Sequence, residues 1–139
     1  MNEIKLARQR LADAVGLPAV LAAGWEIFEL IAVIAALSAD EASGMYPAFT
    51  FARGAAVSGR DAVAFAPSTP PTAGDPVPSP PEPARDVYET ADALAGLASA
   101  LRMRLRESAE LAVDTADRSA CERAATDAER ITGLLAKGN

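Results

Sequence analysis

Hydrophobic and polar residues alternate with a helical period along most of the chain. In residues 2–15 apolar side chains recur every three or four positions, with charged residues between them, which is typical of an amphipathic helix. Gly16 suits a left-handed helix cap, and Pro18 suits the first turn of a second helix, because the missing N–H of proline costs nothing there. The sequence therefore predicts helices over residues 2–15 and 18–39.

A third element is predicted over residues 45–66. Five of its apolar residues fall near one helical face, namely Phe49, Ala52, Ala56, Val63 and Ala66. Gly54 and Gly59 weaken a helix, because glycine costs about 1 kcal/mol relative to alanine in a helix interior. The alternative is a β-hairpin that turns at residues 58–61. We favour the helix, with a break at Gly59 left open.

Residues 67–83 hold eight of the ten prolines of the chain. Proline lacks a backbone donor and its ring clashes with a preceding helical turn, so this stretch is neither helix nor central strand. We interpret it as a linker in extended polyproline II conformation. The alternative is a docking strip for an aromatic groove of a partner, since several proline pairs have PxxP spacing.

Residues 84–139 contain a heptad seam, in which small or apolar residues recur at alternating steps of four and three. The seam includes Leu94, Ala98, Leu101, Leu105, Ala112, Ala120, Ala124 and Ile131. Because neither Gly nor Pro occurs between residues 98 and 132, one continuous long helix is an open alternative. Asp114 or Thr115, followed by Asp117, resembles a helix N-cap. We favour two helices that separate near residues 113–117.

These elements predict an all-α fold, an alanine-rich antiparallel bundle of four to five helices interrupted by the proline-rich linker. The expected organisation is an N-terminal helical unit over 1–66, the linker over 67–83, and long C-terminal helices over 84–139. Alanine makes up about a quarter of the chain and aromatic residues only 5%. Such a core gains contact energy by bringing backbones close together.

The few aromatic rings are expected to fill the larger spaces of this core. The set comprises Trp25, Phe28, Tyr46, Phe49, Phe51, Phe65 and Tyr88. The alternative is a ligand pocket lined by Trp25, Phe28 and Phe49, since pockets in helical bundles have this composition.

Glu26 and Glu29 share one face of the otherwise apolar second helix. Paired buried carboxylates can bind metal or do acid–base chemistry, but a di-iron site of the glutamate–histidine type is excluded because the chain has no histidine. We instead predict a structural clamp across the hairpin of the second and third helices. In it Glu29 lies level with Arg53 and Glu26 lies level with Arg60.

Two further features carry chemistry in other proteins. Arg102, Arg104 and Arg106 lie beside Glu107 and Glu110, so we interpret them as a solvated helix flank, with an anion patch as the alternative. The single cysteine, Cys121, has alanine-rich surroundings. We expect it to be a small buried residue without nucleophilic activity.

Charge argues against a nucleic-acid partner. The formal net charge is −6, and nucleic-acid binding needs a concentrated basic face. Residues 11–26 resemble the helix-turn-helix core of phage-repressor-type DNA-binding domains. The resemblance consists of Ala12, four residues before the turn glycine Gly16, and the apolar Leu17 after it. The recognition helix that this resemblance implies, residues 19–24, has no polar side chain to contact base edges.

Residues 17–37 are long enough to span a bilayer. Their ten Leu, Ile, Val and Phe residues contribute about −3 to −6 kcal/mol to insertion. Glu26 and Glu29 cost about 2.5 kcal/mol or more each, so a spanning helix is not favoured. The N-terminal residues lack the apolar centre of a signal peptide. We expect a cytoplasmic protein that is not inserted in a membrane.

No phosphate-binding loop, dinucleotide fingerprint, nucleophile elbow or zinc spacing occurs in the sequence. We therefore expect no catalytic residues, no metal site and no cofactor. The leading hypothesis is a non-catalytic helical module that self-associates, or docks on a protein partner, through its alanine-rich seam. A small-molecule-binding bundle is the alternative.

Overall fold

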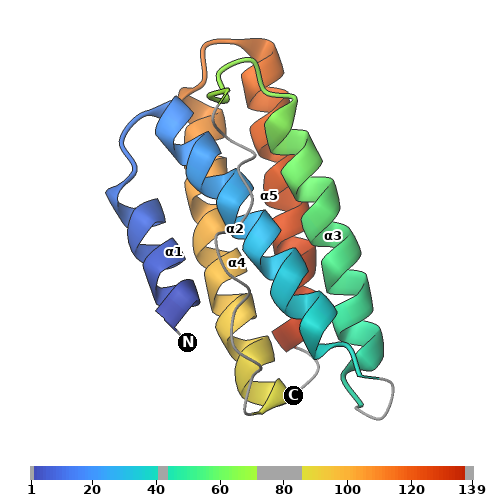
Figure 1. Ribbon diagram of the computed structural model, residues 1–139. Helices are drawn as coiled ribbons and strands as arrows, with labels where there is room; N and C mark the ends of the chain where they lie inside the picture. Colours follow the sequence, from blue (N-terminus) through green and yellow to red (C-terminus); the bar gives the residue numbers. More distant parts are fainter. Residues whose placement is uncertain (1, 41–43, 72–85, 137–139) are drawn as a thin grey trace.

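The computed structural model describes residues 2–40, 44–71 and 86–136, and these contain five α-helices and no strand. The helices are α1 (Asn2–Asp13), α2 (Leu17–Ser38), α3 (Tyr46–Ala64), α4 (Val87–Leu111) and α5 (Thr115–Ala136) (Figure 1). The predicted all-α bundle is confirmed. Most of the predicted linker, residues 72–83, lies outside the described residues.

Both open questions about the helices have an answer. The third element is one continuous helix that passes through Gly59 without a break, and no hairpin forms there. The C-terminal region consists of two helices, separated by residues 112–114. Asp114 caps α5, because its carboxylate accepts hydrogen bonds from the backbone N–H groups of Ala116 at 2.7 Å and Asp117 at 3.2 Å.

The turn between α1 and α2 depends on glycine. Gly16 precedes α2 with a φ of 87°, a backbone region that side chains disfavour. Pro18 lies in the first turn of α2, as predicted. The first helix ends at Asp13, two residues earlier than predicted, so Gly16 acts at the start of α2 and not at the end of α1.

Helices α2, α3, α4 and α5 form a four-helix bundle. The packed pairs are α2 with α3, α3 with α5, α5 with α4, and α4 with α2, and α1 lies outside the bundle against α2 and α4. Figure 1 shows α2 and α5 running in one direction and α3 and α4 in the other. Every neighbouring pair is therefore antiparallel, and the parallel pairs lie on the diagonals.

This arrangement explains why a long connection is needed between α3 and α4. The two helices run in the same direction, so Ala64 and Val87 lie at opposite ends of the bundle (Figure 1). The chain must travel the length of the bundle, about 30 Å for a helix of this size. The connections after α2 and α4, in contrast, are short in sequence and join antiparallel neighbours.

Small side chains let the helices approach closely. Gly59 of α3 lies directly against the ring of Phe28 in α2, and a Cβ atom at Gly59 would fall 2.4 Å from Phe28 Cε1. Alanines occupy core positions with at most 1% exposure, namely Ala35, Ala52, Ala56, Ala91, Ala98, Ala124, Ala125 and Ala128. The core thus combines a few large residues with close backbone contacts.

Candidate functional site

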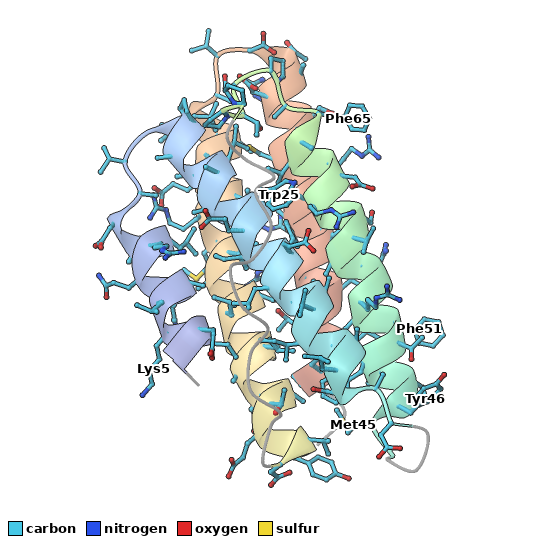
Figure 2. The ribbon with its side chains drawn as sticks, in the orientation of Figure 1. Lys5, Trp25, Met45, Tyr46, Phe51 and Phe65 are labelled. Carbon is cyan, nitrogen blue, oxygen red and sulfur yellow. The ribbon has the colours of Figure 1, made fainter. Side chains whose placement is uncertain are left out.

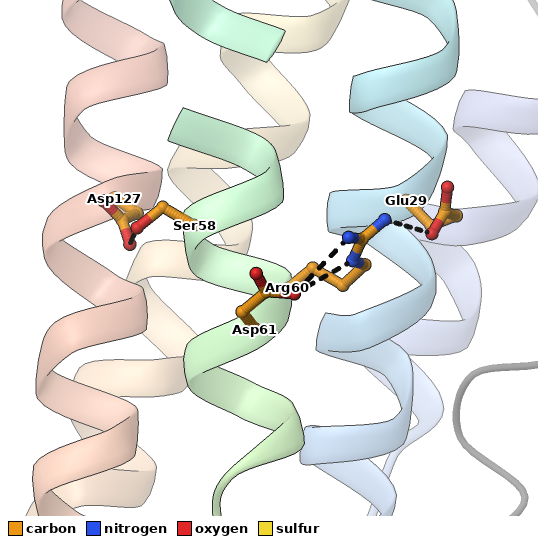
Figure 3. Close-up of polar contacts among 5 residues, drawn as sticks. All are labelled: Glu29, Ser58, Arg60, Asp61 and Asp127. Carbon is orange, nitrogen blue, oxygen red and sulfur yellow. Dashed lines mark hydrogen bonds and ion pairs between the residues drawn. The ribbon is translucent and has the colours of Figure 1, made fainter. Parts of the chain in front are cut away.

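Of the four residues predicted as a clamp, the structure joins Glu29 and Arg60. Arg60 Nη1 donates to Glu29 Oε2 at 2.9 Å, across the α2–α3 contact (Figure 3). Both side chains are largely shielded, with 19% exposure for Glu29 and 26% for Arg60. The hydrogen bond to Glu29 raises the pKa of Arg60, with smaller contributions from the charges of Glu29 and Asp61.

The other two members of the predicted clamp lie elsewhere. Glu26 lies near Arg10 of α1, with 3.5 Å between Oε2 and Nη1, and Arg53 is exposed. The predicted pairing was wrong because it considered only the positions of the Cα atoms along the two helices. Helical side chains lean toward the N-terminus of their own helix. In antiparallel helices Arg60 and Glu29 therefore lean toward each other, whereas Arg53 leans away.

The C-terminal heptad seam faces the interior of the same chain, which corrects its assignment as a partner interface. Its eight named residues range from 0% to 7% exposed, because α2 and α3 cover the faces that α4 and α5 leave open. The list is Leu94, Ala98, Leu101, Leu105, Ala112, Ala120, Ala124 and Ile131. This seam holds the bundle together and is not a free surface.

Six of the seven aromatic residues divide into two groups, of which only one lies in the core, and the seventh, Tyr46, is half-buried. Phe28 and Phe49 are fully buried, and Trp25 packs half-buried against the same core. These three rings therefore fill interior space where a pocket was the alternative. Phe51, Phe65 and Tyr88 were expected in the core, and this expectation was wrong. Their side chains are 66%, 83% and 48% exposed.

The arginine-rich segment of α4 makes contacts within the chain. Arg102 and Arg106 lie 3.8 and 3.1 Å from Glu129 of α5. Arg104 donates to the backbone oxygens of Leu11 at 2.6 Å and Ala14 at 2.8 Å. It thereby satisfies carbonyls at the end of α1, where a cation also interacts favourably with the helix dipole. This role has no local signature in the sequence.

An open depression of about 580 Å³ lies between α4 and α5. It is lined by Arg106, Ala109, Glu110, Arg118, Glu122 and Thr126. Its two arginines already have partners: Arg106 binds Glu129, and Arg118 donates to the backbone oxygen of Ala112 at 2.9 Å. The lining carries balanced charge, and both of its arginines make contacts within the bundle.

Two carboxylates whose burial was not predicted from the sequence lie at the contact between α5 and the α3 region. Asp127, 7% exposed, accepts a hydrogen bond from Ser58 Oγ at 2.9 Å (Figure 3). Asp117, 3% exposed, accepts from Ser68, which follows α3. Their spacing contained a signal, because Asp117 and Asp127 fall in a three–four repeat with Ala120, Ala124 and Ile131. A carboxylate in such a stripe needs a polar partner from the facing helix.

Cys121 is buried and unpaired, as predicted. Burial raises the pKa of its thiol to about 11, with smaller contributions from the charges of Asp117 and Glu122. A thiol with this pKa is almost entirely protonated near neutral pH.

Exposed aromatic residues gather on the outer face of α3. Figure 2 shows Phe51 and Phe65 pointing away from the bundle on the same side of this helix. Both rings belong to a heptad stripe of exposed residues, here called the outer stripe of α3, which comprises Pro47, Phe51, Gly54, Ser58, Asp61 and Phe65. A heptad stripe that faces solvent has the geometry of a helix–helix contact.

The helix that the helix-turn-helix resemblance would use for recognition lies in the bundle. Val20, Leu21, Ala23 and Gly24 are buried, so this part of α2 has no free face for a DNA groove. Helix α2 is also long and apolar enough to cross a membrane, but 61% of its apolar stretch is buried in the bundle. The core helix of a soluble protein can have the same length and composition.

No group of three or more His, Cys, Asp or Glu side chains that could hold a metal ion occurs among residues 2–40, 44–71 and 86–136. Comparisons with protein-family models, with curated proteins and with solved structures find no match for this chain.

Proposed function

We propose that this protein is a non-catalytic protein–protein interaction module whose contact surface is the outer stripe of α3. The observation that carries the proposal is the exposure of Phe51 and Phe65, 66% and 83%, on the same side of one helix. Aromatic side chains are enriched in protein interfaces, where they bury a large area with few rotatable bonds.

The scarcity of charge on this helix supports the same interpretation. Of the eight exposed residues within α3, only Arg53 and Asp61 are charged, whereas five of the ten exposed residues within α5 are charged. Interface centres are depleted in charged residues relative to the remaining surface. The exposed surface of α3 therefore has the low share of charged residues that is typical of a contact surface, whereas the exposed surface of α5 has the higher share that is typical of a surface facing solvent.

The middle of the outer stripe also has room for a second backbone. A Cβ atom at Gly54 would meet no atom within 4 Å, and Ser58 is the next stripe residue. Small residues at successive stripe positions let two helices approach closely. The rings at both ends then act as anchors beside a flat centre.

We also propose that the module acts in the cytoplasm. The unpaired, buried thiol of Cys121 and the burial of most of the apolar window of α2 support this placement. The buried seam of α4 and α5 contributes to stability and leaves the outer stripe of α3 as the surface for partners.

Photo-crosslinking in cells that produce the protein tests the proposal. A photoreactive amino acid replaces Thr50, which is exposed on α3, and in a matched control it replaces Lys5 of α1, on the other side of the bundle (Figure 2). We expect adducts from position 50 that disappear in the Phe51→Ser variant, and none from position 5. Absence of adducts at position 50 would contradict the proposed function.

A further inference from the structure

We propose that the occupant of the outer stripe of α3 is a second copy of this chain, packed antiparallel about a two-fold axis near Ser58. This inference rests on the proposed function, because it names the partner of the same surface. Three properties of the stripe are self-complementary, and each follows from a different set of residues.

The first property is the symmetric position of the rings. Phe51 lies seven residues before Ser58 and Phe65 lies seven residues after it. Two copies of α3 that cross antiparallel at Ser58 therefore bring Phe51 of each copy against Phe65 of the other, about 10 Å from the axis on either side. A two-fold interface requires such reciprocal pairing.

Charge complementarity is the second property. Asp61 belongs to the outer stripe and Arg53 is exposed on α3 to one side of it, and residue positions 53 and 61 are nearly equidistant from residue 57 or 58. The antiparallel arrangement brings Arg53 of each copy within about one helical turn of Asp61 of the other. The two-fold axis repeats this pairing, so opposite charges are brought to the same level twice in the dimer.

The internal contacts of these two residues leave them available for such pairing. Among the described residues Arg53 makes no ion pair, and its side chain is exposed. Asp61 contacts Arg60 through Oδ1 at 3.4 Å, but Arg60 is already held at 2.9 Å by Glu29. Asp61 therefore keeps a carboxylate oxygen for a cation from outside.

The third property is the low profile at the proposed axis. Gly54 has open space above it, and the hydroxyl of Ser58 is turned to Asp127 of the same chain. Neither residue obstructs a facing helix. An interface one helix wide lies at the small end of stable interfaces, so we expect reversible association at micromolar concentrations.

Sedimentation of the purified full-length chain between about 1 and 300 µM tests the inference, and we expect a monomer–dimer equilibrium in this range. Arg53→Asp and Asp61→Arg each place like charges across the interface, so each variant alone should raise the dissociation constant about tenfold or more. Mixing the two variants creates a heterodimer with both opposite-charge pairs intact, and association should return to within a few-fold of the wild type.

Lys5→Asp is the matched control, because it makes the same charge change on α1, on the other side of the bundle (Figure 2), and should leave the dissociation constant unchanged. A wild-type chain that is monomeric at 300 µM would overturn the inference. So would a dimer that neither variant weakens, or weakened variants that mixing does not rescue. Adducts from position 50 with a different protein would preserve the proposed function while this inference fails.

Discussion

Asp117, in the first turn of α5, holds Ser68, the fourth residue after the end of α3. Its carboxylate accepts a hydrogen bond from the backbone N–H of Ser68 at 3.0 Å and another from the Ser68 hydroxyl at 2.6 Å. Thr69 lies beside this contact and donates to the backbone oxygen of Val63 at 2.6 Å. The chain is thus fixed to the bundle just where it leaves α3 for the far end.

Replacing Asp117 should destabilise the fold more than replacing its partner. Asp117→Ala leaves the backbone N–H of Ser68 without an acceptor, and an unsatisfied group in a shielded site costs about 1–3 kcal/mol. Ser68→Ala removes one hydrogen bond and should cost about 1 kcal/mol. Urea unfolding of both variants measures the two losses, and equal stability of Asp117→Ala and the wild type would show that the contact contributes nothing.

The contact between Gly59 and Phe28 predicts an unusual response to alanine. Alanine normally favours a helix by about 1 kcal/mol over glycine, but a Cβ atom at Gly59 would clash with a ring that is fully buried and cannot move aside. We expect Gly59→Ala to lower the free energy of unfolding by about 1–3 kcal/mol.

Gly133 supplies the matched control for this substitution. It lies in α5, and a Cβ atom there would meet no atom within 4 Å, so Gly133→Ala should raise the free energy of unfolding by up to about 1 kcal/mol. Urea titrations of both variants should therefore shift in opposite directions. A stabilising Gly59→Ala would mean that the helices lie farther apart than described.

The helices themselves could be predicted from the sequence because their signals are local. Apolar residues at a 3.6-residue period, Pro18 in a first turn and Asp114 at an N-cap each act within a few neighbouring residues. The same periodicity correctly assigned Phe49, Ala52, Ala56, Val63 and Ala66 to the core face of α3. It also places Phe51 and Phe65 on the opposite face. Their assignment to the core came from composition, and the helical period was the better guide.

Tertiary relationships were beyond the reach of these patterns. Helices α2 and α3 cover the C-terminal seam because α3 and α4 lie diagonally opposite in the bundle. The residues of the seam alone do not indicate which helices cover it. Arg104 reaches two carbonyls at the end of α1, ninety or more residues earlier in the chain, and an arginine that caps a distant helix has no local signature. To identify the outer stripe of α3, both the helical period and the exposure of its residues in the described part of the bundle were needed.

The buried thiol of Cys121 predicts a loss of stability at high pH. Its pKa is raised from 9.0 to about 11 in the folded chain, so below pH 9 the thiol is protonated in both the folded and the unfolded state. Between about pH 9 and 11 the unfolded chain releases this proton and the folded chain does not, which favours unfolding by about 2–3 kcal/mol in total.

A comparison with Cys121→Ala isolates this effect from the titration of other groups. The free energy of unfolding should fall more steeply between pH 9 and 11 for the wild type than for the variant. Thiol labelling of the native wild type should also be slow at pH 8. Parallel pH profiles for the two proteins would show that the thiol ionises equally in both states.

Arg104 should govern whether α1 stays attached to the bundle. Helix α1 buries Ile4, Ala7 and Leu11 but lies outside the four-helix arrangement, and Arg104 is bonded to two carbonyls at its end. Arg104→Met keeps much of the aliphatic contact and removes both hydrogen bonds, each worth about 1–3 kcal/mol for a charged donor. Hydrogen exchange should then accelerate in α1 at least tenfold, with α3 and α5 unchanged. Uniform exchange across all helices would contradict local release.

Close packing of alanine on α4 and α5 predicts that larger residues push these helices apart. Ala98 and Ala124 have no exposed surface, and the two helices share an extensive antiparallel contact. Leucine has nearly the helix propensity of alanine, so Ala98→Leu or Ala124→Leu tests packing alone. Added methylene groups in a filled core cost about 1–3 kcal/mol, and the melting temperature should fall by several degrees.

Ala116→Leu, at an exposed position of α5, is the control and should leave the melting temperature nearly unchanged. If both core variants had the same melting temperature as Ala116→Leu, cavities beside Ala98 and Ala124 would have to accommodate the new side chains. Close packing of small residues would then not be the interaction that holds α4 against α5.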